Sequence, residues 1–413
     1  MKLRGQGRTL CTIILITLVG TAAACDDSGR SPVEDPTPSV DGTPPADRDS
    51  YQITDVDMEA PSDAPPTAAE RLLRIDGSYV LLGHDLREED GGIWVAPDLT
   101  DWEARGGWIA GYSGVQRVVG LVEHDGGWIG AYNERPSGLP PLAWHVSTSD
   151  GGRNWHEEAL PAAKSQPSTA SGIVSADDRI IVAGSRAEHE TKHPVVWRSR
   201  DGDQWTMGKL PSDLPSDSDK SVAPRQPFRI GERILIPGAA LTYDGDQVTS
   251  SKPLLWSSTD GGKTFKRSVL PSPGDLPVPL FGLHTDAVDL LFGWSGSDAV
   301  VWRSEDDGRT WQPRPESTLA HPPEGQSYPR RAVQVGDCLV LAGVIGDPTT
   351  DEPVPAAMWR SCDAGKSWSR MATDELDDAD ATEAVDLIRA GDSLVLVTNS
   401  ADDGSVRLLR LQQ

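Results

Sequence analysis

The sequence predicts an all-β protein built from repeated small sheets, and three observations support this fold class. The chain of 413 residues contains 41 Gly and 33 Pro beside 37% hydrophobic residues, a composition typical of a turn-rich globular protein. A short turn motif recurs along most of the chain, and a pair of apolar strands precedes each copy. Because the chain is also too long for one ordinary core, these features favour a β-propeller, in which four-stranded sheets (blades) surround an axis.

The recurring motif consists of Ser or Thr, then Asp two residues later, then Gly and an aromatic residue. Five segments carry it, namely residues 148–155, 199–205, 258–265, 304–311 and 361–368, and residues 96–102 form a degenerate sixth copy. Successive motif Asp residues lie between 46 residues (Asp260 to Asp306) and 59 residues (Asp201 to Asp260) apart. This spacing fits one four-stranded blade per motif.

The motif resembles the Asp-box, also called the BNR repeat, of sialidases, sortilin-like receptors and photosystem II assembly-factor propellers. In such a hairpin turn the Asp carboxylate accepts hydrogen bonds from backbone N–H groups, the Gly permits positive φ, and the aromatic ring packs on the sheet. A structural role is therefore expected for Asp98, Asp150, Asp201, Asp260, Asp306 and Asp363. A Trp stands just before most of the motifs, and its recurrence in the repeat favours core packing for Trp94, Trp144, Trp197, Trp256, Trp302 and Trp359.

Seven apolar strand pairs accompany only six motifs, which predicts seven blades and leaves six blades as the alternative. Examples of the strand pairs are residues 172–184 and 332–343, each interrupted by a polar turn. The seventh unit ends at residues 405–411 with no motif and no fourth strand. Residues 51–58 are similar to the fourth strands of the other units, so we expect this N-terminal strand to complete the last blade and cover its edge.

The N-terminus has the three parts of a signal peptide. Basic residues precede a short apolar stretch at residues 10–19, and three alanines then lead into Cys25. Small residues directly before a Cys resemble the bacterial lipobox, and this resemblance implies cleavage before Cys25 and lipid attachment to it. We therefore expect membrane contact through the lipid on Cys25, on the extracytoplasmic face of the cell membrane.

The expected domain organisation has three parts. Residues 1–24 form the lipoprotein signal peptide, and residues 25–50, rich in Pro, Asp and Ser, form a disordered tether. Residues 51–413 form the propeller. No apolar stretch after Cys25 is long enough to span a bilayer.

The charge of the chain excludes some partners. The formal net charge of −25 repels phosphate backbones, so nucleic-acid binding is not expected. The eight His are scattered without zinc spacing, and the sequence contains neither a complete calcium loop nor a phosphate-binding Gly loop. We expect no cofactor, no metal and a monomer, with a protein or glycan partner whose identity the sequence does not reveal.

No catalytic residue is identified. Resemblance to sialidases would imply an Arg triad, a Tyr/Glu pair and an Asp acid, together with a Phe-Arg-Ile-Pro segment before the first motif. Here Phe228, Arg229 and Ile230 are followed by Gly231 and come after three motifs, so we interpret the match as chance. Basic residues on the expected innermost strands could instead bind an anionic ligand or pair with local carboxylates, and these are Arg74, Arg229, Arg331 and Arg389.

Cys338 and Cys362 are predicted to form a structural disulfide. In an antiparallel pair, facing residues have numbers with a constant sum, and these two numbers place the centre of the hairpin at residue 350, inside a polar loop. Export to an oxidising compartment would permit the bond. The alternative is a pair of free thiols.

The most favoured function is a non-catalytic binding or scaffold module for an envelope or extracellular partner. Two alternatives stay open, a sialidase-like exo-glycosidase and an assembly factor for envelope proteins. Whether the protein is an enzyme is undecided at this point, because propellers host many functions.

Overall fold

The computed structural model describes residues 52–56, 58, 68–85, 90–107, 114–136, 140–162, 166–188, 191–212, 220–245, 247–296, 298–314, 319, 327–346, 354–371, 382–400 and 405–412. All of these belong to one compact unit, Asp49–Gln413. Every regular element in these ranges is a β-strand, and none of them is a helix that could cross a membrane. Cys25 and the predicted tether lie outside the described residues.

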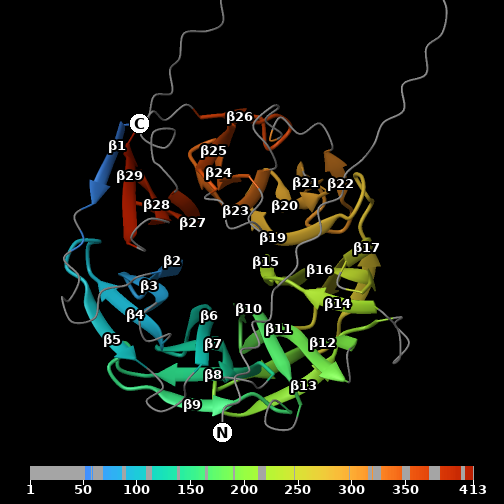
Figure 1. Ribbon diagram of the computed structural model, residues 1–413, viewed down its shortest axis with the longest axis horizontal. Coiled ribbons are helices and arrows are strands. Elements are labelled where there is room, and N and C mark those ends of the chain that lie inside the picture. Colours follow the sequence, from blue (N-terminus) through green and yellow to red (C-terminus); the bar gives the residue numbers. More distant parts are fainter. Residues whose placement is uncertain are drawn as a thin grey trace, which may run out of the picture. The chain divides into compact units, whose positions relative to one another are not determined.

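The strands form seven antiparallel sheets arranged as a β-propeller, as predicted (Figure 1). Blade 1 contains β2 (Ala68–Ile75), β3 (Ser78–Asp85), β4 (Asp90–Ala96) and β5 (Glu103–Gly107). Blade 2 contains β6 (Gly114–His124), β7 (Gly127–Pro136), β8 (Leu142–Thr148) and β9 (His156–Ala159). Blade 3 contains β10 (Ser168–Ala176), β11 (Arg179–Glu188), β12 (Thr191–Ser199) and β13 (Trp205–Lys209).

The remaining blades repeat this order. Blade 4 contains β14 (Lys220–Pro224), β15 (Phe228–Ile230), β16 (Arg233–Asp244), β17 (Gln247–Ser258) and β18 (Lys266–Val269). Blade 5 contains β19 (Val278–His284), β20 (Asp289–Ser295), β21 (Asp298–Ser304) and β22 (Gln312–Arg314). Blade 6 contains β23 (Ser327–Val335), β24 (Cys338–Ile345), β25 (Ala356–Ser361) and β26 (Ser369–Arg370). Blade 7 contains β27 (Thr382–Ala390), β28 (Ser393–Ser400), β29 (Val406–Gln412) and β1 (Gln52–Val56).

The N-terminal strand closes the ring. β1 pairs with β29, and Ile53 faces Leu411 across the two strands. Both side chains are buried in the core between blades 6 and 7. Seven blades and closure by residues near 51–58 are thus confirmed, and the six-bladed alternative is wrong.

Three of the Trp residues that precede the motifs explain another repeated feature, the Leu-Pro step that ends several blades. Trp197, Trp256 and Trp302 are fully buried. Their indole Nε1 groups donate to the carbonyl oxygens of the preceding blade's Pro161, Pro211 and Pro271, at 2.9, 2.8 and 2.8 Å. Each Trp therefore fills the core and satisfies its own N–H at the seam between two blades.

The first strand of each blade is irregular. The alternation of polar and apolar residues in the sequence does not reveal this irregularity. This strand lies nearest the axis in Figure 1, and a β-bulge interrupts its pairing in six blades, for example between Ala69 and Arg71 and between Ala384 and Asp386. In blade 4 a longer break at residues 225–227 separates β14 from β15, and both strands pair with β16. A bulge re-aims the side chains beside it, so these irregularities decide which residues face the axis.

Candidate functional site

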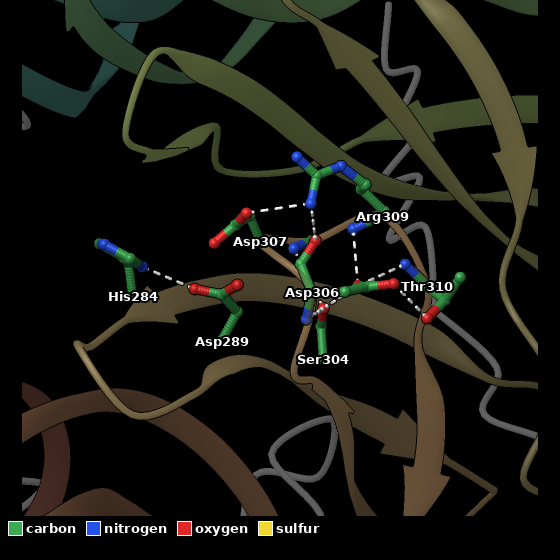
Figure 2. Close-up of polar contacts among 8 residues, drawn as sticks. His284, Asp289, Ser304, Asp306, Asp307, Arg309 and Thr310 are labelled. Carbon is green, nitrogen blue, oxygen red and sulfur yellow. Dashed lines mark hydrogen bonds and ion pairs between the residues drawn. The ribbon is translucent and has the colours of Figure 1, made fainter.

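The Asp-box turns form a dense network of local hydrogen bonds, shown for blade 5 in Figure 2. Asp306 Oδ1 accepts from Ser304 Oγ at 2.8 Å and from the backbone N–H groups of Arg309 and Thr310 at 3.0 and 2.8 Å. Thr310 Oγ1 donates to the other carboxylate oxygen at 2.7 Å. Partial burial pushes the pKa of Asp306 upward, but the hydrogen bonds from Thr310 and Ser304 outweigh it and lower the pKa to about 2.

The other complete boxes have the same arrangement. The Ser or Thr hydroxyl donates to the Asp, and the Asp accepts backbone N–H groups from the turn, at Asp150, Asp201, Asp260 and Asp363. In the degenerate box, Asp98 accepts from both the backbone N–H and the hydroxyl of Thr100. The turn itself therefore occupies these carboxylates. We call the end of the propeller that carries these turns the box face.

Three of the four arginines that the sequence suggested as ligand-binding residues lie at the turn between the first and second strands of their blades. These turns are at the box face. Arg74 lies over the Tyr79 ring at 5.6 Å, and Arg389 Nε donates to the Gly391 carbonyl at 2.9 Å. Arg229 donates to Asp177 of the neighbouring blade at 2.8 Å. These side chains are engaged locally, and the structure does not bring them together with Arg331.

The segment that carries Arg229 is a core strand. Phe228 and Ile230 are both buried, and the Phe228 ring lies so close to Gly282 that a Cβ there would come within 2.3 Å of it. The resemblance of residues 228–230 to a sialidase segment therefore has a packing explanation.

Arg331 instead belongs to a charged cluster at the axis. Arg71 of blade 1 and Arg331 of blade 6 approach opposite oxygens of Asp386 from blade 7, at 3.8 and 3.5 Å. The Leu72 backbone N–H donates to Asp386 at 3.0 Å. Gln226 reaches in from the break in blade 4. With its side-chain amide turned so that the oxygen faces the arginines, this oxygen accepts from Arg331 at 3.0 Å and from Arg71 at 3.2 Å. Four blades thus meet in one cluster.

The axial cluster is deeply placed. The Asp386 side chain is 3% exposed and that of Arg71 is 16% exposed. Burial lowers the pKa of Arg71 to about 10, and the nearby Arg331 acts in the same direction, while Asp386 opposes them. Because Asp386 lies between two guanidinium groups and accepts a backbone N–H, it holds the blades together at the axis.

Two further ion pairs surround the mouth of the axis. We call this end the entry face, because each first strand begins there, opposite the box face. Glu70 lies 2.9 Å from Arg117, and Glu383 pairs with Arg330. These four residues line a cavity of about 440 Å³ together with Asn399. Burial raises the pKa of Glu70 to about 7, although Arg117 opposes this shift.

A larger cavity lies beside the mouth, between blades 2 and 3. Its volume is about 680 Å³, and Arg117 lines both cavities. We call this second cavity the inter-blade groove. Its apolar walls are formed by Pro140, Pro141 and Pro167. Three basic side chains also line it, those of Arg117, Arg135 and Lys192. The remaining described lining residues are Asn, Ser, Thr and Ala, so no carboxylate, His, Cys or Tyr is among them.

Arg117, Asn133 and Arg135 share one face of blade 2. Arg117 faces Asn133 across β6 and β7, and Arg135 stands two residues beyond Asn133, on the same side of the strand. That side faces blade 3, because the Asn133 amide donates to the Ala170 carbonyl at 2.9 Å and accepts from the Ala170 N–H at 2.7 Å. The sequence analysis missed these residues, since the wedge between two sheets depends on tertiary structure.

The predicted hairpin around residue 350 is also present. Leu339 pairs with Ser361 across β24 and β25, which is the predicted register. Cys338 and Cys362 are joined by a disulfide, with their Cα atoms 4.1 Å apart.

Comparisons with known proteins concern the fold alone. No protein-family model and no curated protein matches the sequence. A Hadza microbial sialidase aligns with a TM-score of 0.48 and 14% identity, over 82% of this chain and 74% of the sialidase. Trypanosoma rangeli sialidase in complex with the inhibitor DANA aligns with a TM-score of 0.45 and 11% identity, over 76% of this chain and only 56% of the sialidase. A protein of unknown function from Dyadobacter fermentans aligns with a TM-score of 0.45 and 16% identity, over 72% of this chain and 94% of that protein.

Proposed function

We propose that this propeller is a non-catalytic binding module and that its partner docks in the inter-blade groove on the entry face. One observation carries the proposal: the groove combines apolar walls with basic side chains, and its described lining contains no carboxylate or His. Such a lining can hold a ligand, but it does not supply the acid–base pair that glycoside hydrolysis requires.

The axial carboxylates support the same interpretation. Asp386 is held by two arginines, Glu70 by Arg117 and Glu383 by Arg330. A glycosidase needs two carboxyl groups that face the sugar from opposite sides of the scissile bond. In the described part of the entry face these three carboxyl groups bind cations of the protein itself.

A test combines partner capture with a turnover assay. Ala187 lines the groove, and Ala187→Trp should fill it and abolish capture of the partner from envelope extract after crosslinking. Val269→Trp is the matched control, because Val269 is exposed on the outermost strand of blade 4. Turnover of a fluorogenic sialoside that Glu70→Gln abolishes would make the protein an enzyme and overturn the proposal.

We further propose that lipid on Cys25 tethers the propeller at the outer side of the cell membrane. The support is the sequence alone, with an apolar stretch and three alanines before Cys25 and an acidic, Pro-rich segment after it. Cys25→Ala should move the protein from the membrane fraction to the soluble fraction. A variant that stays in the membrane fraction would contradict the tether while leaving the binding proposal intact.

A further inference from the structure

We infer that the inter-blade groove binds an extended acidic peptide whose carboxylates alternate along the strand. The inference rests on the proposed function and names its ligand class. It depends on three properties of the groove, namely the charge of its rim, the spacing of two arginines and the chemistry of its walls.

The rim is cationic on a strongly acidic protein. The whole chain has a formal net charge of −25, yet Arg117, Arg135 and Lys192 converge on this one groove. Arg135 and Lys192 are exposed and have no ion-pair partner in the described ranges. The side chain of Arg117 is 73% exposed and touches Glu70 through Nε. Arg135 and Lys192 are therefore available to a ligand, and Arg117, although it pairs with Glu70, keeps most of its side chain exposed. The negative charge of the rest of the protein repels acidic partners, so these cationic groups would guide such partners to the groove.

The spacing of the arginines favours carboxylates at alternate residues. Arg117 and Arg135 are diagonal neighbours on one face of β6 and β7, a relationship that places side chains about 7 Å apart. In an extended peptide, residues i and i+2 point to the same side and are also about 7 Å apart. A peptide with Glu or Asp at i and i+2 can therefore pair both arginines at once, each through a bidentate contact.

Hydrogen bonds hold the strands on both sides of the groove in place. Asn133, which faces Arg117 and stands two residues before Arg135, binds both backbone groups of Ala170 and so fixes blade 2 against blade 3. Across the groove, Thr169 and Ser185 share a hydrogen bond of 2.9 Å between their hydroxyls. The strands beneath the cationic side chains are thus fixed before a ligand binds, which lowers the cost of ordering on binding.

The walls favour a peptide over an anionic sugar. None of the described lining residues is aromatic, so the groove offers no flat ring on which a sugar could stack. Pro140, Pro141 and Pro167 supply apolar walls without backbone N–H donors of their own. These walls suit the small apolar or Thr side chains that alternate with carboxylates in a strand.

The test measures binding of labelled peptides to the purified protein by fluorescence anisotropy at low ionic strength. The probe has the sequence Thr-Glu-Thr-Glu-Thr-Glu-Thr with blocked ends. One control peptide carries Gln in place of Glu. The other, Glu-Thr-Thr-Glu-Thr-Thr-Glu, has the same composition but no two Glu at i and i+2. We expect the alternating peptide to bind about tenfold or more tightly than either control, and equal binding of the three would overturn the inference.

Charge-reversal variants locate the site. The double variant Arg135→Glu/Lys192→Glu should weaken binding of the alternating peptide by about tenfold or more. The matched control Lys209→Glu/Lys266→Glu makes the same change of net charge on the outer strands of blades 3 and 4, where both lysines are exposed. It should change affinity by about twofold or less, because screening limits distant charges. Equal losses in the two double variants would show that only net charge matters and would reject the site.

Other outcomes separate this inference from the proposed function. If trigalacturonate binds and its binding depends on Arg135, while the peptide does not bind, the ligand is an anionic glycan and the peptide inference is rejected. If Ala187→Trp abolishes partner capture but neither probe binds, the groove is a docking site of another chemistry, and the inference alone fails. If the peptide binds but partner capture does not depend on Ala187, the proposed function fails and the anion site remains.

Discussion

Asn399 in blade 7 clamps Ala69 in blade 1 through both ends of its side-chain amide. Its Oδ1 accepts from the Ala69 N–H at 2.8 Å, and its Nδ2 donates to the Ala69 carbonyl at 3.0 Å. The two residues are 330 positions apart, so the contact seals the seam where the last blade meets the first. Asn133 holds Ala170 in the same way at the seam between blades 2 and 3.

Asn399→Ala should therefore weaken ring closure. Ala69 is buried, and the substitution leaves its N–H and carbonyl without partners, which costs about 1–3 kcal/mol of unfolding free energy. Urea denaturation followed by Trp fluorescence measures the change. Asn399→Asp should restore only part of the loss, because a carboxylate accepts from the Ala69 N–H but has no donor for the Ala69 carbonyl. A wild-type midpoint for Asn399→Ala would contradict the role of the clamp.

Asp386→Ala should destabilise the protein more strongly. It leaves Arg71 and Arg331 without their shared carboxylate and removes the acceptor of the Leu72 N–H. Removing one member of a buried ion pair typically costs about 3–5 kcal/mol. Asp386→Asn keeps an oxygen for the Leu72 N–H and should lose less than Asp386→Ala. Thermal unfolding of the two variants side by side checks the order, and equal stability of Asp386→Ala and wild type would refute the axial role.

Asp306→Ala should lower stability without affecting the groove. It deletes the acceptor of Ser304, Arg309 and Thr310 at the opposite end of the propeller from the groove, and a loss of about 1–3 kcal/mol is expected. Peptide binding by the folded variant should equal that of wild type. Weaker peptide binding at unchanged stability would assign a functional role to the box face.

The Asp306 carboxylate also makes the free energy of unfolding depend on pH. The folded pKa of Asp306 is about 2, below its ordinary value of 3.8, so its contribution is fully present above pH 4. That contribution is lost as the pH falls from about 4 toward 2, because the unfolded chain then binds the proton more readily. Between pH 6 and pH 3 the wild type should lose more unfolding free energy than Asp306→Ala, as measured by urea titrations at each pH. Parallel losses would show that this carboxylate does not contribute.

The fold could be predicted from the sequence because the repeat fixes each blade locally. The Asp-box turn, the buried Trp and the Leu-Pro step are close together in the chain, and their spacing reveals the blade. The position of residues 51–58 could be predicted because the other units have four strands and the last unit has only three. The N-terminal segment resembles the strand that is missing.

The site could not be predicted in the same way. Counting from the hairpin turn aligns Arg74 with Arg229 and Arg389, but the β-bulge lies further up the strand and shifts which residues face the axis. Arg71 and Asp386 stand directly after such bulges, and alternation of polar and apolar residues does not reveal a bulge. The groove is harder still to predict, because it forms where two sheets diverge and its residues come from five strands and two connecting segments of two blades.

The last prediction concerns Cys338 and Cys362, which face each other at one end of β24 and β25. Leu339 pairs with Ser361, so the next positions outward are the two cysteines, and the disulfide joins them. It closes a loop over a sequence separation of 24, for which the chain-entropy model gives about 3 kcal/mol. Thiol titration of the denatured, unreduced protein should therefore find no free thiol from this pair. Cys338→Ser/Cys362→Ser should melt several degrees lower than the oxidised wild type, whereas peptide binding in the groove of blades 2 and 3 should not change. Reduction of the wild type with dithiothreitol should lower its melting temperature to that of the double variant, and two titratable thiols in the unreduced protein would reject the bond.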